Sequence, residues 1–117
     1  MTTSLNKKAY EFAADHIRKG KVVADQRDEW SEHQPSTKQE NDFIEAHGWD
    51  EYAKWHLGVD DEASEDTKAR YKFPYGDFTR VHRCGLLAAE VRAGRQKYGD
   101  IEDATIKLRD MIEKQNA

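Results

Sequence analysis

The chain has 117 residues, of which 36% are charged, and its formal net charge is −4 at pH 7. This length is typical of one compact domain, so we predict a single helical domain over residues 1–117, with acidic loops at 25–35 and 59–67. The longest run of small or apolar residues, 85–89, is far shorter than the ~20 residues that span a bilayer, and no apolar segment follows the charged N-terminus. We therefore expect no membrane association and predict a cytoplasmic location.

Hydrophobic residues recur at three- and four-residue steps in several segments, and each such segment predicts an amphipathic helix. The first is predicted at 4–19, and the short apolar stretch 21–24 is too brief to found a sheet. Ser36 and Gln39 have the spacing of a capping box, which predicts the start of a second helix. A short third helix is predicted after Asp50, which can serve as its N-cap.

The longest predicted helix covers about 78–98 and begins after Asp77, which we interpret as its N-cap. Its apolar stripe consists of Val81, Cys84, Leu87, Ala88 and Val91. Asp100 then caps a last helix, and the short link between the two predicts that they pack as neighbours. No segment shows a convincing period of two. The predicted fold class is therefore all-α, a small bundle of four or five helices around the central helix.

Several short blocks of the chain resemble one known group of proteins. The blocks are Lys68-Ala69-Arg70-Tyr71-Lys72-Phe73-Pro74-Tyr75-Gly76-Asp77-Phe78, Val81-His82-Arg83-Cys84, Ala88-Ala89-Glu90, Arg92-Ala93-Gly94, Trp30-Ser31-Glu32-His33, Pro35-Ser36 and Trp55-His56-Leu57-Gly58-Val59-Asp60. Together they resemble a family of short uncharacterised bacterial proteins, a domain of unknown function. The Tyr-x-Phe-Pro block, followed by a helix rich in Ala and Arg, is similar to a small block in some tailed-phage head proteins. Neither resemblance implies an activity, a cofactor or a catalytic residue.

The residue types that bind metals or act as nucleophiles occur without a recognised spacing. The five histidines match no zinc template, and Cys84 is the only cysteine. His82 and Cys84 are two residues apart, so on a helix they point to different sides. We therefore predict no metal site, no cofactor and no catalytic residue, and we interpret Cys84 as a small buried hydrophobic residue.

Charge is distributed unevenly along the chain. Residues 24–66 carry three basic and fourteen acidic residues, whereas 67–99 carry eight basic and two acidic residues. The start of the central helix concentrates cations, and cations there favour a nearby anion. The candidate anion- or partner-binding residues are Lys72, Tyr75, Arg80, His82 and Arg83. The anion can be the acidic connector 60–66 of the chain itself or an external phosphate or acidic partner.

These observations favour a small non-enzymatic interaction or regulatory module, because arginines beside aromatic residues are typical of binding surfaces. One alternative is nucleic-acid or phosphate-anion binding through the basic segment 68–97, although the sequence pI of about 5.7 is acidic for such a protein. A second alternative is a small enzyme of undetermined chemistry, since abundant carboxylates are present without a recognisable catalytic motif.

Overall fold

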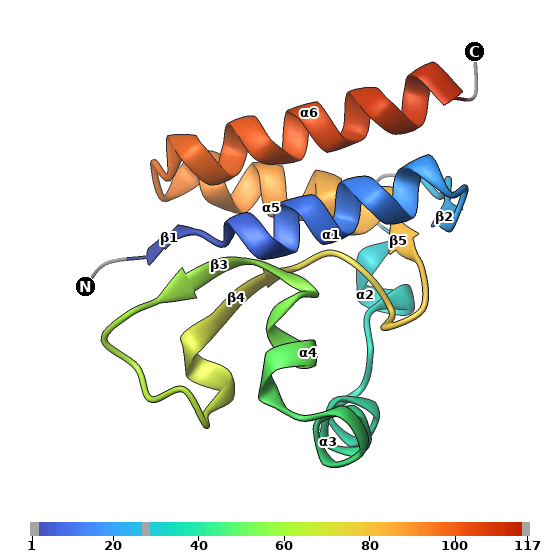
Figure 1. Ribbon diagram of the computed structural model, residues 1–117. Coiled ribbons are helices and arrows are strands. Elements are labelled where there is room, and N and C mark those ends of the chain that lie inside the picture. The colour runs from blue at the N-terminus through green and yellow to red at the C-terminus, as the bar shows by residue number, and fades with distance from the viewer. Residues whose placement is uncertain (1–2, 27–28, 116–117) are drawn as a thin grey trace.

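The computed structural model describes residues 3–26 and 29–115 (Figure 1). In chain order the elements are β1 (Thr3–Leu5), α1 (Lys7–Arg18), β2 (Val22–Val23), α2 (Trp30–His33), α3 (Thr37–His47), α4 (Trp49–Ala53), β3 (His56–Asp60), the 3₁₀ helix η1 (Lys68–Arg70), β4 (Tyr71–Pro74), β5 (Val81–His82), α5 (Arg83–Arg95) and α6 (Gly99–Gln115). None of the helices in these two stretches is long and apolar enough to cross a membrane.

The strands form two small sheets. Strand β3 is the centre of an antiparallel sheet with the order β1-β3-β4, and β2 pairs in parallel with β5. The fold is therefore α+β, and the prediction of an all-α bundle is wrong. The strands are two to five residues long and β3 is buried along most of its length, so none shows the alternation that a half-buried strand would carry. These segments form strands because each pairs with a segment that is distant in the sequence.

Helices α1, α5 and α6 lie on one side of the molecule, and β3, β4 and α4 lie on the other (Figure 1). Helices α5 and α6 pack against each other, as their short link predicts. The core between the two sides includes Ile17, Leu57, Leu86 and Leu108, all fully buried. Tyr75 is also fully buried, and its hydroxyl donates to the backbone oxygen of Lys54 at 2.6 Å.

The predicted central helix starts later than expected. Helix α5 begins at Arg83, not at residue 78, and the two residues before it form β5. Asp77 does not cap the helix, because its Oδ1 accepts from the backbone N–H groups of Thr79 and Arg80 and closes a turn. An aspartate before a helical pattern can either cap the helix or close a turn. Here β5 pairs with β2, so strand residues follow and Asp77 closes a turn.

Of the other local predictions, some are confirmed and others are wrong. Both hydrogen bonds of the capping box between Ser36 and Gln39 are present, and α3 ends before Gly48 as predicted. Helix α4 begins after Gly48 instead of after Asp50 and ends at Ala53, because the following residues pair as β3. The predicted acidic loops contain regular structure: α2 lies within 25–35, and β3 extends into 59–67.

Candidate metal centre

The pairing of β2 with β5 brings together two segments that are almost sixty residues apart. Val23 lies opposite His82, and both strands end here. The chain leaves β2 toward Asp25 and leaves β5 into α5, where Cys84 occupies the first turn. Because the strands are parallel, Asp25 and the His82–Cys84 segment emerge at the same edge.

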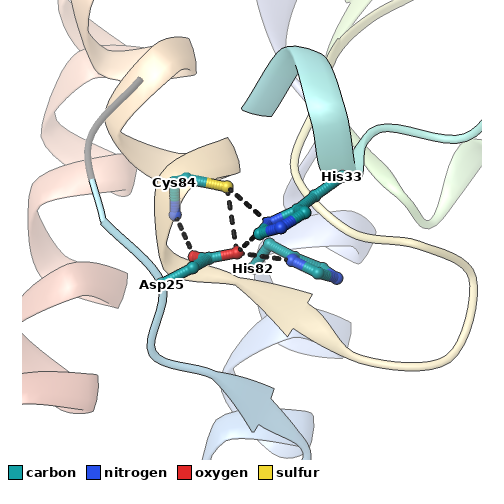
Figure 2. A group of neighbouring side chains, drawn as sticks. All are labelled: Asp25, His33, His82 and Cys84. Carbon is teal, nitrogen blue, oxygen red and sulfur yellow. Dashed lines mark hydrogen bonds and ion pairs between the residues drawn. The ribbon is translucent and has the colours of Figure 1, made fainter. Parts of the chain in front are cut away.

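Four side chains meet at this edge (Figure 2). Asp25, His33, His82 and Cys84 each direct one potential metal-ligating atom into the group, and these atoms all lie within 4.8 Å of one another. His33 enters from the end of α2. Asp25, His82 and Cys84 are buried, and the His33 side chain is 33% exposed. We call these four residues the Asp25 cluster.

Asp25 is the hub of the cluster. Its Oδ2 lies 2.7 Å from Nδ1 of His33, 2.7 Å from Nδ1 of His82 and 3.0 Å from Sγ of Cys84. Its Oδ1 accepts from the backbone N–H of Cys84 at 2.7 Å. This N–H is one of the unpaired donors of the first turn of α5, so Asp25 caps the helix from a distant segment. Burial alone would raise the pKa of Asp25, but these hydrogen bonds outweigh it and lower the pKa to about 2.

A second carboxylate orients His82. Oδ2 of Asp77 lies 2.8 Å from Nε2 of His82, on the side of the ring away from Asp25. A metal-ligating histidine typically donates its other ring N–H to a carboxylate in this way. Burial would raise the pKa of Asp77, but hydrogen bonds from His82 and from the turn lower it, so Asp77 stays ionised. Because Asp77 binds Nε2 of His82, Nδ1 of the same ring is the nitrogen that faces the other residues of the Asp25 cluster.

The cysteine is buried, and its thiol faces ionisable side chains. Burial and the adjacent Asp25 carboxylate raise the pKa of the Cys84 thiol. The thiol donates to Asp25, and its sulfur lies 3.7 Å from Nδ1 of His33. The prediction that Cys84 is buried is confirmed, with 1% of its surface exposed, whereas its partners are ionisable side chains.

A pocket of about 340 Å³ adjoins the cluster at Cys84. It is lined by Trp30, Ser31, Gln34, Cys84, Leu87, Ala88, Val91, Arg92 and Arg95. Trp30 lines the pocket and also borders the Asp25 cluster, because its ring centroid lies 6.0 Å from that of His82. The metal-ligating residue types and a pocket with two arginines are thus neighbours in the fold.

Two of the five residues that the sequence analysis selected belong to this region. His82 is a member of the Asp25 cluster, and Arg83 borders it, with Nη1 donating to the backbone oxygen of Asp25 at 3.3 Å. Arg83 also lies 3.4 Å from Glu113 of α6, so it has an internal anionic partner.

The other three selected residues lie elsewhere. Tyr75 is a core residue, Lys72 is half-buried on β4, and Arg80 is exposed in the turn before β5. In the predicted acidic connector, Asp61 lies 3.7 Å from Arg70. Binding of an external anion by the selected residues stays a prediction.

Sequence reasoning missed Asp25 and His33 as site residues and gave Cys84 a different role. The signal that could have found them is the pair His82 and Cys84. The rule that residues two apart point to different sides holds within a helix, but His82 is extended and Cys84 is in the first helical turn. A strand-to-helix junction can therefore direct both side chains to one point.

No protein-family model, curated protein or solved structure matches this chain. The resemblance to a family of short bacterial proteins and to a block of phage head proteins therefore stays a prediction. The interpretation of the Asp25 cluster depends on its own geometry.

Proposed function

We propose that this chain is a metal-binding protein that holds one zinc ion at the Asp25 cluster. The observation that carries this proposal is the convergence of Asp25, His33, His82 and Cys84 within 4.8 Å. One thiolate, two imidazoles and one carboxylate form a ligand set of intermediate softness, which suits Zn²⁺ better than Mg²⁺ or Ca²⁺.

The distances are close to those of a tetrahedral site. Zinc–ligand bonds of about 2.0–2.3 Å place tetrahedral ligand atoms about 3.3–3.8 Å apart. Sγ of Cys84 and Nδ1 of His33 are 3.7 Å apart, within this range. Asp25 Oδ2 lies 2.7–3.0 Å from the other ligand atoms, so it has to withdraw by under about 1 Å to admit the ion.

The hydrogen bonds within the Asp25 cluster can be exchanged for metal bonds. The Cys84 thiol points its hydrogen at Asp25, and ring nitrogens of His33 and His82 lie at hydrogen-bond distance from the same oxygen. A cation at the centre takes the place of these hydrogens. The thiol hydrogen leaves as a proton, and each imidazole hydrogen directed at Asp25 leaves as a proton or moves to the other nitrogen of its ring, so that Nδ1 offers a lone pair. Four protein ligands complete the coordination, which is typical of a structural zinc site. The ion would join α2 to β5, to α5 and to the segment after β2.

A thiol nucleophile is the second chemistry that a cysteine and a histidine can supply, but the geometry favours metal binding. A catalytic cysteine needs a stabilised thiolate. Here the Asp25 carboxylate lies 3.0 Å from the sulfur and disfavours the thiolate. A divalent cation between the two groups removes this conflict, because it attracts both anions.

The test is metal stoichiometry on the purified chain. After exposure to zinc and dialysis, we expect one zinc ion per chain. Cobalt is the spectroscopic probe, since tetrahedral Co²⁺ absorbs in the visible and a cobalt–thiolate bond adds a near-ultraviolet charge-transfer band. Because Cys84 is the only cysteine, that band can arise only from this residue within one chain.

Three variants decide whether the binding occurs at the cluster. We expect Cys84→Ala to abolish the charge-transfer band and His33→Ala to weaken zinc binding at least tenfold. His47→Ala is the matched control, because His47 is an exposed histidine on α3 and its variant should bind zinc like the wild type. The proposal is wrong if the wild type takes up no more zinc than Cys84→Ala does, or if His33→Ala and His47→Ala bind zinc equally.

A further inference from the structure

The pocket beside Cys84 follows one face of α5. Its α5 residues, from Cys84 through Leu87, Ala88, Val91 and Arg92 to Arg95, recur at intervals of three and four positions. At 1.5 Å per residue, Cys84 and Arg92 are about 12 Å apart along the helix axis. The other wall consists of Trp30 and Ser31 from α2 and the following Gln34. The pocket is therefore elongated, with the Asp25 cluster at one end and two arginines toward the other.

The arginine end carries two positive charges that form no ion pair among residues 3–26 and 29–115. Arg92 and Arg95 are exposed, and neither has an ion-pair partner within the part of the chain that the structure describes. No acidic residue is among those that line the pocket. Two arginines one turn apart can hold a carboxylate or phosphate through charge-assisted hydrogen bonds.

The α5 wall between the two ends is apolar, and Ser31 and Gln34 add polar groups on the facing wall. Val91 is 37% exposed and is the one exposed large hydrophobic residue among residues 3–26 and 29–115. It lies next to Arg92, and Leu87 and Trp30 continue the apolar lining toward Cys84. An exposed valine between an aromatic wall and two arginines suits the apolar body of a ligand whose charged end reaches the arginines.

We propose that this pocket binds a small organic anion. Arg92 and Arg95 hold its carboxylate or phosphate head, and its apolar body lies on Val91 and Leu87 against Trp30. The volume of about 340 Å³ is at the lower end of the about 300–1,000 Å³ typical of small-molecule sites. This inference goes beyond zinc binding and does not depend on it, because none of these five residues is a proposed metal ligand.

The probe is 4-phenylbutyrate, which has an aromatic body and a carboxylate head. Its amide, 4-phenylbutyramide, has nearly the same shape without the charge, and 3-phenylpropyl phosphate replaces the carboxylate by a phosphate. Each is titrated into the purified chain in EDTA. Binding is followed by the NMR shift of the Trp30 indole N–H, which is assigned by comparison with Trp30→Phe. The carboxylate and phosphate arms identify the preferred head group.

We expect at least one of the two anions to shift the Trp30 signal and to bind at least tenfold more tightly than the amide. The double variant Arg92→Gln/Arg95→Gln should lose this advantage. Arg18→Gln/Lys107→Gln is the matched control, because it removes the same charge from two exposed basic residues that do not line the pocket. That control should bind the anion like the wild type.

Three results would overturn the inference. One is that neither anion shifts the Trp30 signal. Another is that the amide binds as tightly as both anions. The third is that the two double variants bind the anion equally. Because zinc is absent from these titrations, none of these results bears on the metal centre, which is tested by stoichiometry.

Discussion

The substitution Asp25→Asn tests whether Asp25 organises the junction of β2, β5 and α5 without metal. Asparagine has the same shape as aspartate but no charge. The oxygen of the new amide could still accept from the backbone N–H of Cys84. Its NH₂ group, however, would take the place of Oδ2, which now faces the Cys84 thiol and the Nδ1 atoms of His33 and His82.

The magnitude follows from these contacts. A hydrogen bond to a charged group contributes about 1.5–3 kcal/mol net. The two imidazoles can turn a lone pair toward the new NH₂ group, so the losses do not add fully. We expect Asp25→Asn to lower the free energy of unfolding by about 3 kcal/mol. With an unfolding entropy of about 2.1 cal/mol/K per residue, the melting temperature should fall by about 12 °C.

The assay is thermal and urea unfolding in EDTA at pH 7, followed by circular dichroism. Asp15→Asn is the matched control, because Asp15 is half exposed in its ion pair with Lys19 and its substitution should leave the melting temperature nearly unchanged. Excess zinc should then raise the melting temperature of the wild type more than that of Asp25→Asn. If Asp25→Asn unfolds in EDTA within about 0.5 kcal/mol (the error of such a comparison) of Asp15→Asn, Asp25 does not organise the junction.

Three further predictions concern other residues. Complete burial lowers the pKa of His56 to about 4 despite its hydrogen bond to the Tyr52 carbonyl. Below about pH 6.5 the unfolded chain takes up a proton at this histidine that the folded chain does not. The free energy of unfolding should therefore fall by about 3 kcal/mol between about pH 6.5 and 4. In urea unfolding, the stability of His56→Phe should depend less on pH than that of the wild type. Asp77→Asn should weaken zinc binding about 10–100-fold in a competition titration while the cobalt–thiolate band persists; an unchanged affinity would show that Asp77 does not orient His82. Tyr75→Phe removes a buried hydroxyl that donates to a backbone oxygen and should cost about 1–3 kcal/mol in urea unfolding; a cost near zero would contradict this role.

The sequence by itself determined the features that depend on neighbours within one or two helical turns. The capping box of Ser36 and Gln39 is such a feature, because its donors and acceptors are three residues apart. The buried stripe of α6 is another, since Ile101, Leu108 and Ile112 follow the helical repeat. The capping hydrogen bonds and the periodicity of the stripe are both set by residues close together in the sequence, so local spacing is enough to predict them.

Only the tertiary structure decided the strands and the candidate site. Strands of two to five residues carry too short a pattern to be recognised, and β2 and β5 become strands only because they pair with each other. That pairing makes α5 begin at Arg83 instead of residue 78 and carries Asp25 to Cys84 across 59 positions of sequence. A metal-ligand set of this kind has no fixed spacing along the chain, because its geometry is set where separate segments meet in space.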